Sequence, residues 1–319
     1  MEIVPYLRRP DWPVNRPLLV ELAAELARRG DEAPIDVRPF DELSPDERQR
    51  VRVAIVDGPS EEQLEALPNL EWLQSTWAGV EQLLAVVPEH VPIARMIDPQ
   101  LGHTMSEAVL AWTLYLHRDM PRYARQQADH DWIMHQLVPT RARRVGVLGL
   151  GALGALAAST LAQHGFDVAG WARSPKHIDG VECFSGTVGF DTLLQRSDIV
   201  VNLLPDTPST RGLLDDAAFG RLPDGASVIN FGRGHTIDDG ALLRALASRL
   251  EHAVLDVFVT EPLPDDHPYW DHPRVTVLPH ISGPTSPDTA AIIAAGNIAR
   301  WLRDDVQPAD ALVDRTRGY

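Results

Sequence analysis

VGVLGLGALGALAASTLAQHGFDVAGW, residues 145–171, is the stretch that decides the fold. Its first four residues are an apolar run typical of a buried strand, and residues 152–164 are alanine-rich, as in a helix that Gly165 can end. The turn between them has the pattern G-x-G-x-x-G, with Gly149, Gly151 and Gly154. In that pattern the first glycine permits a tight bend, the second lets the backbone approach a pyrophosphate, and the third lets the helix pack on the strand. The stretch predicts a strand, a turn and a helix that bind a dinucleotide.

Short apolar runs recur after this unit, with helical patterns between them, of which residues 237–250 are the clearest. The runs are VAGW (168–171), DIVVNLL (198–204), SVINF (227–231), AVLDVF (253–258) and VTVLP (275–279). Strands that alternate with helices form a parallel sheet covered on both faces. We therefore predict an α/β fold with a Rossmann-type doubly wound parallel sheet.

The first hundred residues alternate in the same way over shorter distances, which predicts a second, smaller α/β domain. Its expected strands are EIVPYL (2–7), IDVRP (35–39), VAIVD (53–57), EWLQS (71–75) and IARMI (93–97). Asn15 can cap a helix that runs to Arg29, with Gly30 beyond it, and Ser60 with Gln63 forms a capping box. The apolar pattern of residues 104–136 predicts two helices broken at Pro121, and Ser286 and Pro287 open a last helix that runs to about Arg303.

Composition excludes several classes of function. The chain has 319 residues, 44% of them hydrophobic and 23% charged, and a net charge of -16, so we expect no affinity for nucleic acid or an anionic membrane. Residues 145–166 are long enough to cross a bilayer, but five glycines interrupt them. The only cysteine, Cys183, allows no disulfide within the chain and indicates a reducing compartment, so we expect a cytoplasmic protein.

The second strand of the dinucleotide unit ends without the acidic residue that usually faces the adenosine ribose. Arg173, Ser174 and Lys176 stand there instead, and two cations with a hydroxyl are donors suited to a phosphate. This predicts a 2′-phosphate, and therefore NADPH in preference to NADH. A solvated basic turn is the alternative explanation.

Three polar residues follow later strands, where parallel sheets place their ligands. Arg233 follows VINFG, Glu261 follows AVLDVFVT and His280 follows VTVLP. Each residue alone also has a non-catalytic explanation: Arg233 as a solvated loop charge, Glu261 as a surface acid and His280 as a core histidine. Together they indicate a catalytic site. The spacing of His130 and His135 does not put both on one helix face, so we expect no metal site.

These motifs give the sequence a resemblance to the D-isomer-specific 2-hydroxyacid dehydrogenases, over nearly the whole chain. It resembles most the glyoxylate/hydroxypyruvate reductase A group, through WAGVE (77–81) and VDRTRGY (313–319). Gly232 replaces the usual alanine, Glu81 replaces the usual aspartate, and HISGPT (280–285) differs from the usual alanine-rich segment. The other motifs that carry the resemblance are GLGALG (149–154), NLLPDTPSTRGLL (202–214), VINFGRG (228–234), LDVFVTEPLP (255–264) and LPHISGPT (278–285).

The resemblance implies a layout and an activity. Residues 1–101 and 284–319 would form a flavodoxin-like substrate-binding domain, and residues 102–283 the dinucleotide-binding domain. The activity would be NADPH-dependent reduction of small 2-keto acids, such as glyoxylate and hydroxypyruvate, to D-2-hydroxy acids. The chain would form a homodimer through its dinucleotide-binding domains. Trp132 would cover the substrate pocket, or else be an interface or core aromatic.

The resemblance also assigns residue roles. His280 would donate the proton, and Glu261 would orient the His280 ring and raise the pKa of His280. Arg233 would bind the substrate carboxylate. The substrate-binding residues would be Trp77, Ala78, Gly79, Arg233 and His280. The cofactor-binding residues would be Gly149, Gly151, Ala152, Leu153, Gly154, Arg173, Ser174, Lys176, Leu204, Pro205, Thr210, Phe231, Gly232, Arg233, Asp256, His280 and Ser282.

Two other functions stay open. One is an NAD-dependent dehydrogenase that acts on a bulkier D-2-hydroxy acid, with NAD as the cofactor. The other is a nucleotide-sensing relative that does not catalyse a reaction. A short-chain dehydrogenase is excluded, because Ala172 stands four residues before Lys176, the sole lysine, where that class needs a tyrosine.

Overall fold

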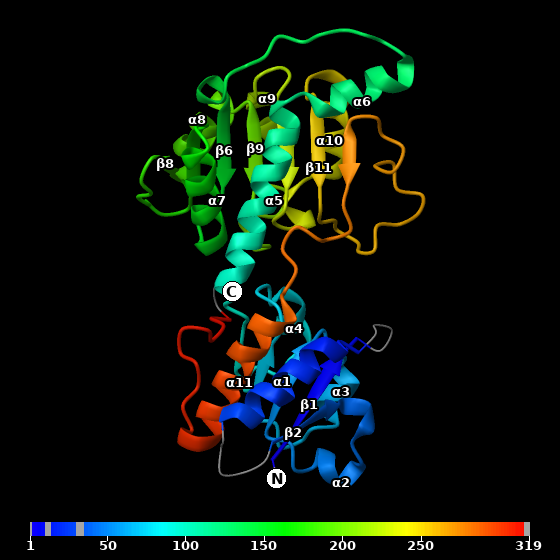
Figure 1. The fold of residues 1–319 in the computed structure, drawn as a ribbon, viewed down its shortest axis with the longest axis vertical. Coiled ribbons are helices and arrows are strands. Elements are labelled where there is room, and N and C mark those ends of the chain that lie inside the picture. The colour runs from blue at the N-terminus through cyan, green and yellow to red at the C-terminus, as the bar shows by residue number, and fades with distance from the viewer. Residues whose placement is uncertain (1, 10–13, 30–34, 316–319) are drawn as a thin grey trace. The chain divides into compact units, whose positions relative to one another are not determined.

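The computed structural model describes residues 2–9, 14–29 and 35–315, and these divide into two compact units. Unit 1 comprises Met1–Leu101 with Thr285–Tyr319, and unit 2 comprises Gly102–Pro284. Each unit contains one parallel sheet (Figure 1). No helix within the described ranges is long and apolar enough to cross a membrane.

The sheet of unit 1 has five strands in the order β2-β1-β3-β4-β5, which is the flavodoxin-like order. The strands are β1 (Glu2–Arg8), β2 (Ile35–Pro39), β3 (Val53–Asp57), β4 (Trp72–Ser75) and β5 (Ile93–Ala94). The helices are α1 (Arg16–Arg29), α2 (Pro45–Arg48), α3 (Glu61–Glu65), α4 (Glu81–Val86) and α11 (Pro287–Asp304), and a 3₁₀ turn η1 (Phe40–Glu42) precedes α2.

Alternate residues of these strands face two separate cores. Val4 and Tyr6 pack with the apolar face of α1 and with the alanines of α11 on one side, where the two helices lie side by side (Figure 1). Ile3 and Leu7 pack on the other side with residues such as Leu83 of α4. Because both faces are covered, the strands read as continuous apolar runs. The C-terminal end of this sheet carries Trp77, Ala78 and Gly79, between β4 and α4.

Unit 2 has seven strands in the order β12-β11-β10-β9-β6-β7-β8, which contains the Rossmann order with one added strand. The strands are β6 (Arg144–Leu148), β7 (Asp167–Ala172), β8 (Glu182–Ser185), β9 (Ile199–Asn202), β10 (Ser227–Asn230), β11 (His252–Leu255) and β12 (Val275–Val277). The helices are α5 (Pro99–His117), whose first turn falls in unit 1, α6 (Met120–Asp129), α7 (Ala152–Gln163), α8 (Gly186–Arg196), α9 (Asp216–Arg221) and α10 (Asp239–Ser248), with 3₁₀ turns η2 (Thr140–Ala142) and η3 (Gly234–Thr236).

Two cores cover the two faces of this sheet. Helices α5 and α7 contribute Val109 and Leu161 to one core, and α8, α9 and α10 contribute residues such as Leu193 and Leu242 to the other. The α/β doubly wound fold predicted for this part of the chain is confirmed. Sheets wound in this way bind ligands outside the carboxyl ends of their strands.

Several expected elements differ in the structure. The prediction of two helices over residues 104–136 is wrong in its bounds, because α6 ends at Asp129 and residues 131–139 are not helical. Pro121 does not break a helix but lies in the first turn of α6, where no hydrogen-bonded amide is needed. The apolar residues that follow, such as Trp132, face solvent and do not continue a buried helix face.

Strand lengths and one strand also differ from expectation. IARMI contributes only Ile93–Ala94 to β5, and β9, β10 and β11 end before the apolar runs do. The residues left over, such as Leu204 and Phe231, are buried in loops at the ends of the strands. The strand β8 was not predicted, because it is a partly exposed edge strand with no apolar run. Asn15 and Ser60 cap their helices as predicted, whereas Gly30 lies outside the described residues.

Candidate active site

The glycine turn after β6 leads into the N-terminus of α7 and leaves it without a side-chain cap. Gly149 has φ +96, its amide donates to the Trp171 carbonyl at 2.9 Å, and a Cβ there would lie 2.9 Å from the Leu203 carbonyl oxygen. At Gly154 a Cβ would overlap the Gly149 carbonyl. At Gly151, by contrast, no other described residue has an atom within 4 Å of the Cβ position.

Gly151 is also the N-cap of α7, and it provides no side-chain cap for the amides of Ala152, Leu153 and Gly154. Uncapped amides at a helix N-terminus, with open space at the Cβ position of Gly151, fit the pyrophosphate of a dinucleotide. The residues present therefore fit such a cofactor.

The end of β7 lies beside this turn, where the Gly149 amide donates to the Trp171 carbonyl. Arg173, Ser174 and Lys176 follow β7 directly, and all three are exposed. A phosphate on the adenosine ribose would therefore have access to their side chains.

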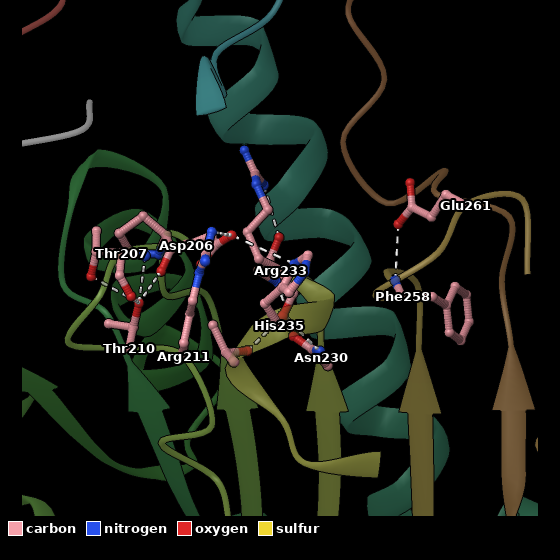
Figure 2. A network of polar contacts seen from close by, with 12 residues as sticks. Asp206, Thr207, Thr210, Arg211, Asn230, Arg233, His235, Phe258 and Glu261 are labelled. Carbon is pink, nitrogen blue, oxygen red and sulfur yellow. Dashed lines mark hydrogen bonds and ion pairs between the residues drawn. The ribbon is translucent and has the colours of Figure 1, made fainter. Parts of the chain in front are cut away.

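The loop that follows β9 is held by its own polar groups. The Thr210 hydroxyl donates to the Pro205 carbonyl at 2.6 Å and accepts from the Thr207 amide at 2.9 Å (Figure 2). Arg211 and Asp206 form a bidentate ion pair in the same loop, with distances of 2.7 and 3.0 Å. Thr210 thus fixes the backbone of the loop.

Arg233 lies in the loop after β10 (Figure 2). Its Nη1 donates to the Gly232 carbonyl at 2.8 Å. Gly234 packs so closely on Phe258 that a Cβ would overlap the Phe258 carbonyl group. Glycine at 234 therefore allows the Arg233 loop and the 258–261 turn to touch. Gly232 is equally tight, since a Cβ there would lie 2.6 Å from the Leu204 carbonyl oxygen.

Glu261 and His280 form a hydrogen-bonded pair. Glu261 Oε2 lies 2.8 Å from His280 Nδ1, and Glu261 Oε1 accepts from the Phe258 amide at 2.9 Å. The hydrogen bond to Glu261 raises the pKa of His280, and burial opposes that rise without cancelling it. Burial raises the pKa of Glu261, but its bonds to His280 and Phe258 outweigh burial and lower it. The pair leaves His280 Nε2 as the nitrogen that can donate to another molecule.

Asp256 holds the backbone directly after His280. Its buried carboxylate accepts the Ile281 amide at 2.7 Å and the Ser282 amide at 2.9 Å. His280 itself has φ +55, a left-handed conformation that is uncommon for a residue other than glycine. The Ser282 hydroxyl is buried and bonds to no group in the described part of the chain.

Trp77, Ala78 and Gly79 lie in unit 1, after β4. The Ser75 hydroxyl accepts from the Trp77 amide at 2.9 Å, and the Trp77 carbonyl accepts from the Met96 amide at 2.9 Å. These bonds fix the start of the segment that leads to α4.

Three residues near the site were missed by the sequence analysis: Asn202, Asn230 and Thr236. The first two are the last residues of β9 and β10, and all three are buried. The available signal for the two asparagines was an amide side chain inside an apolar run, where a buried amide needs partners.

Comparisons with known proteins agree on one family. Residues 110–282 match the model of the D-isomer specific 2-hydroxyacid dehydrogenase, NAD binding domain. Glyoxylate/hydroxypyruvate reductase A of Yersinia enterocolitica is 36% identical over 302 residues, which cover 92% of this chain and 90% of that protein. The same-named protein of Serratia proteamaculans is 38% identical over 276 residues, 83% of this chain and 87% of the relative.

Solved structures resemble the whole chain. A D-isomer specific 2-hydroxyacid dehydrogenase from Xanthobacter autotrophicus, in complex with NADPH and MES, has a TM-score of 0.88 and 38% identity over 99% of both chains. An NADPH-dependent glyoxylate/hydroxypyruvate reductase from Sinorhizobium meliloti, in complex with NADP and sulfate, has a TM-score of 0.86 and 32% identity over 99% of both chains. The chain belongs to the D-isomer specific 2-hydroxyacid dehydrogenases, and it is therefore an oxidoreductase.

Proposed function

We propose that the chain reduces small 2-keto acids, with glyoxylate and hydroxypyruvate as substrates and NADPH as the electron donor. The single observation that carries the proposal is the His280–Glu261 pair at 2.8 Å, at the ligand-binding end of a dinucleotide-type sheet and next to the Arg233 loop. Relatives named for these two substrates, at 36% and 38% identity, support the choice of substrate.

Reduction requires a hydride on the carbonyl carbon and a proton on the carbonyl oxygen. The dinucleotide, when bound, supplies the hydride. His280 supplies the proton from Nε2, and the hydrogen bond to Glu261, which raises the pKa of His280, favours the imidazolium. The C=O π bond breaks, and the products are a 2-hydroxy acid, the oxidised dinucleotide and a neutral imidazole that water reprotonates.

Arg233 binds the substrate carboxylate through the fixed fork of its guanidinium, which also polarises the neighbouring carbonyl. The backbone amides of Ala78 and Gly79, with Trp77, contribute to substrate binding. Glu261 fixes the orientation of the His280 ring.

The cofactor is held by groups at the ends of the strands in unit 2. The amides before α7 bind the pyrophosphate, and Arg173, Ser174 and Lys176 bind the 2′-phosphate. Solved relatives that contain NADPH or NADP support this choice. The remaining contacts that we propose are with Leu204, Pro205, Thr210, Phe231, Gly232, Arg233, Asp256, His280 and Ser282.

Steady-state kinetics with glyoxylate and hydroxypyruvate, each with NADPH and with NADH, test the proposal. We expect turnover with both acids and a higher kcat/KM with NADPH. A preference for NADH would overturn the cofactor assignment. If only bulkier 2-keto acids are turned over, glyoxylate and hydroxypyruvate are not the substrates. Tight cofactor binding without turnover of any 2-keto acid would indicate a nucleotide sensor.

We further propose that the chain forms a homodimer through unit 2. The segment after α6 exposes 96% of Trp132 and 87% of Met134, and Ile133 and Leu137 are exposed beside them. A core role for Trp132 is thereby ruled out. Contiguous apolar side chains of this kind mark interaction surfaces. Light scattering after gel filtration should give a dimer mass, and Trp132→Asp with Met134→Asp should give a monomer; a monomeric parent chain would contradict this.

A further inference from the structure

A buried set of polar side chains lies under the Arg233 loop. Asn202 ends β9, Asn230 ends β10, and Thr236 ends η3, and their exposed fractions are 0%, 1% and 0%. The set bridges two neighbouring strands at the point where each strand gives way to a loop of the candidate site.

The hydrogen bonds of this set can run in only one direction. The Arg233 carbonyl can only accept, so the Thr236 hydroxyl must donate to it, at 2.6 Å. That hydroxyl then accepts from Asn202 Nδ2, also at 2.6 Å, and the second hydrogen of the Asn202 amide goes to Asn230 Oδ1 at 2.9 Å. The amide orientation of Asn202 follows from this chain of donors.

The remaining atoms of the set bind the backbone of both loops. Asn202 Oδ1 accepts the Leu204 amide at 3.2 Å, in the loop after β9. Asn230 Oδ1 accepts the Gly232 amide at 3.2 Å, and its Nδ2 donates to the Arg233 carbonyl at 3.3 Å (Figure 2). The Arg233 carbonyl thus receives two buried side-chain donors.

We infer that Asn202, Asn230 and Thr236 are positioning residues that fix the backbone of Arg233 against the loop that begins at Leu204. The inference rests on the proposed function, since Arg233 is there assigned to the substrate carboxylate. Such a network works as a unit, because removal of the Thr236 hydroxyl leaves one buried N–H of Asn202 without its partner and takes one of several donors from the Arg233 carbonyl. The consequence for the reaction is a guanidinium that is placed before substrate arrives.

The sharpest variant is Thr236→Val, which keeps the shape of the side chain and removes its hydroxyl. We expect KM for glyoxylate to rise roughly tenfold and kcat to fall. Thr236→Ser keeps the hydroxyl and should retain the parent kinetics.

Thr113→Val is the matched control. Thr113 is also fully buried in unit 2, but its hydroxyl bonds to no group in the ranges that the structure describes. This exchange should leave KM and kcat unchanged. If Thr236→Val is insoluble, Thr236→Ala removes the same hydroxyl with less volume.

Two measurements separate positioning from mere stability. In an Arg233→Ala background, Thr236→Val should cause no further rise in KM, because its effect acts through Arg233. Hydrogen exchange measured by mass spectrometry should be faster for peptides that cover 231–237 in Thr236→Val than in Thr236→Ser. Parent-like KM in Thr236→Val, an additive effect in the double variant, or unchanged exchange would each overturn the inference.

The exchange measurement does not need turnover. A parent enzyme that fails to reduce glyoxylate with NADPH therefore refutes the proposed function alone, while the exchange comparison still decides whether the network holds the loop.

Discussion

Glu261 Oε2 lies 2.8 Å from His280 Nδ1, and this pair sets the charge of the proposed proton donor. The bond raises the pKa of His280 and so favours the imidazolium. Reduction requires the protonated ring, so kcat/KM for glyoxylate should be highest below the raised pKa and fall as the pH increases through it.

Glu261→Gln should lower the pKa of His280, because a neutral amide stabilises the imidazolium less than a carboxylate does. The fall of kcat/KM with rising pH should then begin at a lower pH, and kcat at pH 8 should decrease by roughly 10- to 100-fold. The measurement is a pH profile from 5 to 9 for the parent and the variant. A variant with lower kcat but an unshifted profile would mean that Glu261 does not act on the His280 charge.

Asp256→Asn tests the contact that holds the His280 backbone. The two carboxylate oxygens of Asp256 each accept one backbone amide, whereas asparagine has one oxygen that accepts and one amino group that only donates. One of the bonds to Ile281 or Ser282 is therefore lost. Because His280 has φ +55, the loosened loop should move the ring away from its position.

We expect kcat of Asp256→Asn to fall by at least about tenfold, since misplacement of a catalytic group by an ångström has effects of that size or larger. Kd for NADPH, measured by quenching of tryptophan fluorescence, should rise as well, because Asp256 and Ser282 are among the proposed cofactor contacts. A large rise in Kd with a parent-like kcat would show that Asp256 acts chiefly on the cofactor.

Arg173→Asp tests the choice between cofactors. The new carboxylate would repel a 2′-phosphate and could accept from ribose hydroxyls, so kcat/KM should fall strongly with NADPH and little with NADH. Arg303→Asp, on α11 of the other unit, makes the same change in charge and serves as the control. Equal losses with both cofactors would place Arg173 away from the 2′-phosphate.

His252 gives unit 2 a pH-dependent stability. Burial, followed by Arg125 and other nearby cations, lowers the pKa of His252 from 6.5 to about 4. The folded form therefore binds the proton less well than the unfolded chain, and its stability is complete above pH 6.5 and is lost as the pH falls toward 4.

The loss of unfolding free energy should be roughly 3 kcal/mol at most, from 1.36 kcal/mol for each pKa unit. His252→Gln, which can keep the bond to Thr276, should flatten the dependence. Urea unfolding of both proteins at pH 4.5 and 7 provides the comparison. If the unfolding free energies of the two proteins decrease equally between pH 7 and 4.5, other groups, such as His117 or His272, account for the pH dependence of stability.

Local sequence was sufficient for the elements that carry strong signals. The apolar runs located the central strands of both sheets, because a strand buried on both faces can contain few polar residues. Edge strands such as β8 and the end of α6 were not predicted, since partial exposure removes the pattern on which such predictions depend. Apolar runs that continue into buried loops made β9, β10 and β11 look longer than they are.

Sequence alone determined the fold class, the glycine turn and the choice of Arg233, Glu261 and His280 as candidate residues. Only the tertiary structure decided that Asp256 holds the backbone after His280, and that Asn202, Asn230 and Thr236 hold the backbone of Arg233. The physical reason is that a motif identifies a residue type at one point in the chain, whereas the bonds from Asp256 to Ser282 and from Asn202 to Thr236 join residues that are far apart in sequence. Which donor meets which acceptor is fixed only when the parallel strands are in register.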